Sequence, residues 1–196
     1  MATKQEVKRF LKNHRDLKFS AAKFEYTFHL FKDAEDKLFD LSNGILSKIK
    51  DAEANHKQQI ENAETAEEIV NLMRRSYPAD ERMAIVNKAI ALEEVTLPLI
   101  KRRALTSGLD IFIENTVKYF LRCKSNCCDW ILENYRSFRS EYLKSMLCLV
   151  LGFRGDESML DFLIEEADRL EREYPDESFD QGPALAVQEL SDRYLN

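Results

Sequence analysis

Glycine and proline are scarce in this chain, whose 196 residues contain five glycines and four prolines. Sandwiches and barrels of β-strands need many tight turns, and these two residues supply most of such turns. The first 77 residues contain no proline and a single glycine, Gly44, so little interrupts a helix there. The shortage predicts an all-α fold.

Long apolar runs are also missing. No stretch approaches the roughly 20 apolar residues that span a bilayer, and the first residues are charged where a signal peptide has an apolar core. We therefore expect no membrane insertion, no export and a cytoplasmic location. Since no secretory signal accompanies the four cysteines, they are expected as reduced thiols.

The composition is that of a globular protein, with 44% apolar and 33% charged residues and a length that suits one domain. The net charge of -6 is unevenly spread. Residues 1–24 carry seven Lys and Arg against two acids, whereas residues 152–196 carry four Arg against thirteen acids. Such asymmetry is typical either of two solvated faces or of a surface that steers a charged partner.

Apolar residues recur at helical spacing in the N-terminal part. A stripe begins at Phe24 and continues at steps of three, four and seven to Ile49, which predicts a long amphipathic helix or a helical hairpin broken near Gly44. Residues 50–64 are polar apart from Ile60 and are predicted to be an exposed helical end or a connector.

A capping box is expected at Thr65 and Glu68, where each side chain satisfies a free backbone N–H at the start of a helix. Pro78 follows this helix and constrains the residue before it away from helical geometry. We therefore divide the chain into an N-terminal helical segment, residues 1–77, and a second part, residues 78–196.

The second part reads as short helices of about 11–15 residues separated by brief turns. Asp80 is predicted to cap one helix, and Pro98 fits the first turn of the next. The run MLCLVLGF is apolar nearly all round and predicts a helix buried between neighbours. Gly152 is expected at the C-terminus of that helix in left-handed geometry, and Asp156 is expected to cap the following one.

Helix pairs, a proline near the head of the second helix in ALEEVTLPLIKRRAL and a period of about 35–45 residues make residues 80–196 resemble HEAT-like repeat proteins. The segment LGFRGDESMLDFLIEEADRLEREYPDESFDQGPALAVQEL is similar to the tails of bacterial HEAT-like proteins. The resemblance implies antiparallel helix pairs stacked as a short α-solenoid, with residues 1–77 as a helical hairpin or cap, and it implies no activity. The alternative is a generic helical bundle.

Candidate metal ligands are few. Cys123, Cys127 and Cys128 could offer three thiolates to zinc, but a closed site needs a fourth ligand and no histidine is near in sequence. These cysteines, with Cys148, are instead expected to fill small apolar gaps. The histidines have no paired spacing and are expected at the surface or in helix packing; they are His14, His29 and His56. We expect neither a metal nor a cofactor.

Nucleic-acid binding is weakly indicated. Residues 101–103, Lys-Arg-Arg, and the pair Arg74-Arg75 could contact phosphates, but a sequence pI of 5.3 argues against a dominant positive field. Phosphate-binding glycine loops and nucleophile elbows are absent in their recognisable forms. If the chain were a HEAT-like DNA-repair enzyme, Asp129 and Trp130 would be the acid and the aromatic residue to test.

A constrained loop near the C-terminus is the best candidate for a partner contact. Two prolines, a glycine and two aromatics restrict its polar residues, so ordering it on a partner costs little entropy. The candidate contact residues are Tyr174, Asp176, Glu177, Phe179, Asp180 and Gln181. The alternative is that Tyr174 and Phe179 pin the loop to the last two helices.

The function predicted from these observations is a non-catalytic protein- or peptide-binding helical scaffold with a basic partner, whose affinity falls as salt rises. Two alternatives from other classes stay open. One is the nucleic-acid enzyme described above. The other is a structural homodimer whose interface is supplied by the long N-terminal helices.

Overall fold

The computed structural model describes residues 54–195, and all regular structure in this range is helical, so the all-α prediction is confirmed for it. Residues 54–62 are helical and precede the numbered elements. These are α4 (Ala66–Leu72), α5 (Ala79–Ala91), α6 (Glu93–Ala104), α7 (Asp110–Arg122), α8 (Cys128–Asn134), η1 (Tyr135–Ser137), α9 (Glu141–Arg154), η2 (Glu157–Met159), α10 (Leu160–Glu173) and α11 (Gln181–Tyr194).

The N-terminal predictions lie outside the described residues. They are the amphipathic stripe of residues 24–49, the basic segment 1–24, the two histidines His14 and His29, and the dimer interface on the long N-terminal helices.

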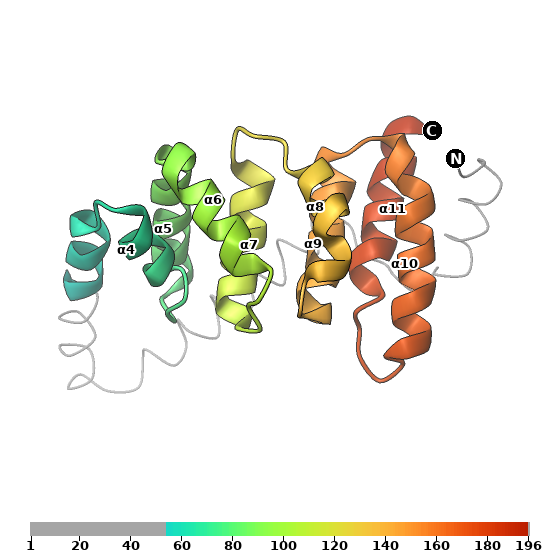
Figure 1. Cartoon of the computed structure of the whole chain (residues 1–196), viewed down its shortest axis with the longest axis horizontal. Helices are drawn as coiled ribbons and strands as arrows, with labels where there is room; N and C mark the ends of the chain where they lie inside the picture. The colour runs from blue at the N-terminus through green and yellow to red at the C-terminus, as the bar shows by residue number, and fades with distance from the viewer. Residues whose placement is uncertain (1–53, 196) are drawn as a thin grey trace, which may run out of the picture.

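The helices follow one another in chain order along the long axis of the molecule (Figure 1). In that view α6, α8 and α10 lie toward the viewer, and α5, α7, α9 and α11 lie behind them. The main contacts join helices that are neighbours in the chain or next but one: α5 packs on α7, α7 on α9, and α9 on α11. Packing is therefore local in sequence throughout the described part.

The core is one continuous cluster of buried apolar side chains that extends from Ile60 to Leu190. Its centre is α9, which packs against α7, α8 and α11. Residues 147–152 of this helix are buried, whereas Met146 is half-buried and Phe153 is exposed, so the predicted burial is confirmed for the middle of the run MLCLVLGF. The surrounding helices bury α9 on nearly every side.

Two of the helix caps predicted from the sequence are present in the structure. The hydroxyl of Thr65 accepts a hydrogen bond from the N–H of Glu68, and the Glu68 carboxylate accepts one from the N–H of Thr65. This capping box confirms the expected start of α4. Asp156 accepts from the N–H of Ser158 and caps the η2 turn, which leads directly into α10.

The predicted position of Asp80 as a helix cap is wrong. Helix α5 begins at Ala79, with Pro78 as its N-cap residue, so Asp80 lies in the first turn. A carboxylate in this turn still favours the helix, because it faces the positive end of the helix dipole.

The predicted position of Pro98 in a first turn is also wrong. Helix α6 begins at Glu93, directly after the end of α5, so Pro98 lies inside the helix. The hydroxyl of Thr96 donates to the carbonyl of Ala89 at 2.7 Å and holds this tight junction together. Glu94 and Pro98 are both exposed, so water can reach the helix carbonyl that proline leaves without an N–H partner.

The prediction for Gly152 fails for a different reason. Gly152 lies within α9, which continues to Arg154, and no glycine of the described residues has a positive φ. A Cβ at this position would lie 2.5 Å from the Cα of Ala186 on α11. At the other end of the same contact, a Cβ on Gly182 would overlap the backbone carbonyl of Ser145. Glycine is needed here for the close approach of α9 and α11, which run in the same direction.

We expect Gly152→Ala to destabilise the protein by about 2 kcal/mol, because the added methyl group has no space between α9 and α11. The measurement is urea unfolding followed by circular dichroism. Gly108→Ala is the matched control, since a Cβ there meets nothing within 4 Å, and it should leave the midpoint unchanged or raise it slightly. Equal midpoints for Gly152→Ala and the wild type would contradict this account.

Candidate functional site

A groove of about 800 Å³ lies between α8 with its η1 turn and α10. Its apolar lining comes from Leu132, Tyr135 and Phe162, of which Leu132 and Phe162 are half-buried and Tyr135 is buried. The rings of Tyr135 and Phe162 meet edge to face with their centres 4.8 Å apart. This floor can bury an apolar side chain of a ligand.

The hydroxyl of Tyr135 anchors the floor to the core. It donates to the Glu166 carboxylate at 2.9 Å and lies 3.3 Å from the Cys148 sulfur. Burial, and then the neighbouring Cys148 and Glu166, raise the pKa of Tyr135 far above its usual range. The hydroxyl therefore stays protonated at neutral pH and serves as a permanent hydrogen-bond donor.

An ion network under the groove joins α9 to α10. Arg169 donates to Glu166 at 2.6 and 2.8 Å, to Glu141 at 2.7 Å and to Glu173 at 2.6 Å. Lys144 donates to Glu141 at 2.7 Å. The hydrogen bonds with Glu166 are the main cause that raises the pKa of Arg169. The network balances most of the charge of its own members.

The same network lowers the pKa of Glu141. Burial alone would raise the pKa of this carboxyl, but hydrogen bonds from Lys144 and Arg169 outweigh burial and lower it below its usual range. Glu141 is therefore ionised at neutral pH.

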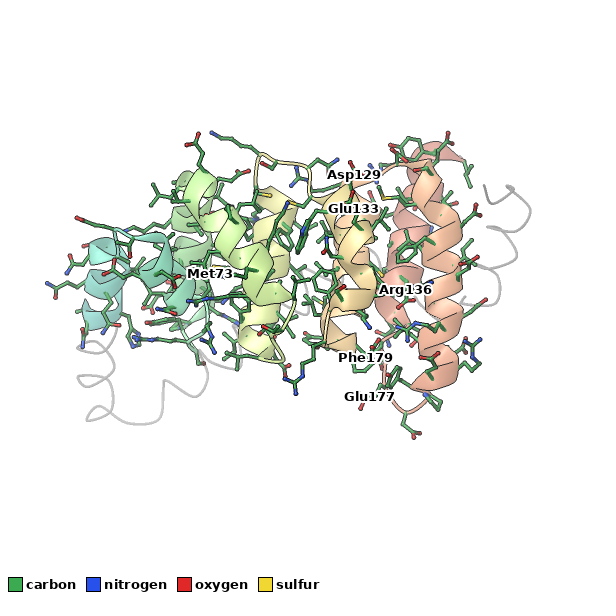
Figure 2. The ribbon with its side chains drawn as sticks, viewed as in Figure 1. Met73, Asp129, Glu133, Arg136, Glu177 and Phe179 are labelled. Carbon is green, nitrogen blue, oxygen red and sulfur yellow. The ribbon has the colours of Figure 1, made fainter. Side chains whose placement is uncertain are left out.

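The exposed charges on the groove walls have opposite signs at the two ends. Glu133 and Arg136 on the first wall and Glu165 and Arg172 on the second line the groove and are exposed. Figure 2 shows Asp129, Glu133 and Arg136 following one another down α8. Because α8 and α10 both begin at the top in Figure 1, the two glutamates lie toward one end and the two arginines toward the other.

The predicted contact loop lies after α10. Phe179 packs between Tyr174, 5.7 Å away between ring centres, and Tyr142 on α9, 6.4 Å away. Asp176 and Glu177 are exposed. The aromatic side chains thus hold the loop against α9 and leave two carboxylates in solvent.

The remaining loop candidates lie at the start of α11. Asp180 is the N-cap residue of this helix, and Gln181 is its first residue. Both are half-buried, so they offer less of their surface than Asp176 or Glu177.

The two residues that a DNA-repair enzyme would use are not brought together in a cleft. Asp129 is exposed on α8, while the ring of Trp130 packs against Phe120 and Phe138 with centres 5.8 and 5.6 Å apart. The ammonium group of Lys101 covers Trp130 at 4.9 Å from the ring centre. This tryptophan is thus a packing residue.

The basic run on α6 is partly balanced by an acid. Arg102 and Arg103 both form ion pairs with Glu67, and Arg103 also donates to Asn71 at 2.7 Å. These contacts tie α6 to α4, and neither arginine lines the groove between α8 and α10.

The cysteines and the third histidine lie in helix contacts. All four cysteines are buried and unbridged, and within residues 54–195 no cluster of three or more histidine, cysteine or acidic side chains is placed to hold a metal. The Nδ1 atom of His56 lies 3.1 Å from a carboxylate oxygen of Glu81, and the His56 ring meets the ring of Tyr77 edge to face.

Sequence reasoning missed the floor and the network of the groove. The spacing of Glu166, Arg169 and Glu173 on α10 signals pairs within one helix. Tyr135 and Glu166 are 31 residues apart in the chain, so no local sequence pattern predicts their hydrogen bond.

The comparisons with known proteins give no further identification. No family model, no curated protein sequence and no solved structure matches the chain. The described helices include none with the length and apolar character required to cross a membrane. The likeness to HEAT-like repeats therefore stays a prediction.

We expect Arg169→Met to destabilise the protein by about 3 kcal/mol, because it leaves the buried carboxylate of Glu166 without its countercharge. The double variant Arg169→Met with Glu166→Gln should recover part of this loss. Arg172→Met, whose side chain is 71% exposed, is the control and should change stability by less than about 0.5 kcal/mol. Thermal and urea unfolding measure all three, and equal losses for the two arginine variants would refute the assignment.

Proposed function

We propose that this chain is a non-catalytic protein- or peptide-binding helical scaffold of the cytoplasm, with the groove between α8 and α10 as its contact surface. The observation that carries the proposal is the combination of an apolar floor with exposed charges of opposite sign at the two ends. The floor contributes the burial of apolar surface, and the charges set the direction in which a bound segment lies.

The proposed architecture is a short α-solenoid of the HEAT-like kind over residues 78–196. Support comes from the local packing, since each unit of a repeat array contacts only its neighbours. The succession of α5 on α7, α7 on α9 and α9 on α11 fits such an array. Successive helices in such an array form extended grooves, and a groove of this kind can bind a peptide without any catalytic group.

The proposed ligand is a peptide segment with three features. An apolar side chain packs on Leu132 and Phe162, a basic side chain pairs with Glu133 and Glu165, and an acidic one pairs with Arg136 and Arg172. This assignment follows from charge complementarity.

The surroundings of the groove favour a partner that is basic in total. Residues 152–196 carry thirteen acids against four Arg, and Asp176 and Glu177 of the loop are exposed. Apart from the four charged residues of α10 that line the groove, these charges lie beyond it, so they attract the partner at long range more than they position it.

The test uses peptides selected from a random display library on the immobilised full-length chain, with dissociation constants then measured by fluorescence anisotropy. We expect enriched peptides to carry both charges around an apolar residue. The double variant Glu133→Lys with Glu165→Lys should bind these peptides about tenfold or more weakly. Peptides whose basic residue is changed to an acid should regain affinity for that variant.

The matched control is Glu64→Lys with Glu94→Lys, which changes the net charge equally at exposed positions outside the groove. It should change affinity by less than about twofold, and binding to the wild type should weaken as salt rises. Absence of enrichment, or equal loss in both double variants, would contradict the proposal. Asp176→Lys with Glu177→Lys then tests whether the loop extends the contact.

A further inference from the structure

The loop between α7 and α8 brings two thiols together. Cys123 is the C-cap residue of α7 and Cys127 the N-cap residue of α8, and their sulfur atoms lie 3.9 Å apart. A disulfide bond needs about 2.05 Å, so the atoms must approach by about 2 Å. The connecting residues 124–126 are exposed, and a three-residue loop at the surface can make this adjustment.

Charged groups from two neighbouring helices surround this pair. The Arg154 guanidinium of α9 lies 3.4 Å from the Cys123 sulfur and also donates to the carbonyls of Phe120 and Cys123. The Glu93 carboxylate of α6 accepts from the N–H groups of residues 124 and 125 at 2.7 and 2.8 Å. Lys101 of α6 adds a second positive charge that acts on Cys127.

This arrangement makes the two thiols unequal. The hydrogen bond from Cys127, followed by that from Arg154, overcomes burial and lowers the pKa of Cys123 to about 7. The pKa of Cys127 is raised, chiefly by its hydrogen bond with Cys123 and by burial. Cys123 is therefore the nucleophile of the pair, and Cys127 holds the proton.

The other two cysteines provide an internal comparison. Burial raises the pKa of Cys128 to about 11 and that of Cys148 far above its usual range. The Cys148 thiol is hydrogen-bonded to the Tyr135 hydroxyl, and the Cys128 sulfur lies 4.0 Å from the carbonyl oxygen of Val150. Neither has the arginine contact that Cys123 has, so both are expected to be unreactive.

We propose that Cys123 and Cys127 form a reversible thiol–disulfide site that hydroperoxides oxidise and small thiols reduce. The proposed thiol–disulfide site is independent of the groove between α8 and α10 and of peptide binding. A packing role alone needs neither the 3.9 Å approach of the two sulfur atoms nor the guanidinium beside one of them.

The proposed reaction balances in two steps. The Cys123 thiolate attacks one oxygen of the hydroperoxide, the O–O bond breaks, and the leaving oxygen takes a proton to give water or an alcohol and a sulfenic acid on Cys123. The Cys127 sulfur then attacks the Cys123 sulfur, and its proton leaves with the hydroxyl group as water. Two electrons pass from the two thiols to the peroxide, and two molecules of a small thiol reverse the change by exchange.

The test treats the reduced, folded full-length protein with hydrogen peroxide at pH 7, blocks remaining thiols with an alkylating reagent and locates the oxidised residues by mass spectrometry. We expect a disulfide between Cys123 and Cys127, reduced again by glutathione, while Cys128 and Cys148 stay alkylated. Cys128→Ser is the matched control: it should react at the wild-type rate, and it removes the ambiguity between neighbouring positions 127 and 128.

Three further variants separate the roles. Cys127→Ser should accumulate a sulfenic acid on Cys123 that dimedone traps, and Cys123→Ser should give neither product. Arg154→Met should slow oxidation by roughly tenfold and shift its pH profile upward, with Arg154→Lys restoring part of the rate. Circular dichroism checks that each variant is folded.

Equal oxidation of all four cysteines in the folded protein, or a disulfide that contains Cys128 or Cys148, would overturn the proposal. So would a reaction that begins only in denaturant, since the pair would then be closed to peroxide in the native state.

Discussion

The close approach of α9 to α11 is the constraint on which the rest of the structure depends. Gly152 and Gly182 lie at the two ends of this contact, and neither position has space for a methyl group. Because α9 also packs on α7 and α8, its position determines where the surrounding helices can lie. Tyr135 reaches Cys148 of this helix, and Arg169 reaches Glu141, so the floor of the groove and the network beneath it are both built on α9.

The properties that could be predicted from the sequence are those set by neighbouring residues. The capping box at Thr65 and the burial of residues 147–152 in α9 follow from spacing within one helix. The roles of Pro98 and Gly152 could not be predicted in this way. Proline is accepted inside α6 because the carbonyl that it leaves without a partner belongs to Glu94, an exposed residue, and glycine is needed in α9 because another helix lies against it. Both reasons belong to tertiary structure.

The groove shows the same limit for function. The acidic total of the C-terminal part suggests a uniform negative surface, but Glu166 and Glu173 of this part pair with Arg169, which also binds Glu141 of α9. The charges that remain available to a ligand are the exposed ones on the two walls, and they have both signs. Which charges are neutralised depends on contacts between helices, so charge counts along the chain predict the long-range field better than they predict the binding site.

The local packing of the helices has a consequence for synthesis on the ribosome. Since the main contacts link helices that are neighbours or next but one, most of the fold can form while later residues are still being added. Among the described helices the exception is the face of α9 that α11 covers, since residues 181–194 emerge last. A nascent chain paused before that point exposes this apolar face to water, where chaperone binding and aggregation compete for it.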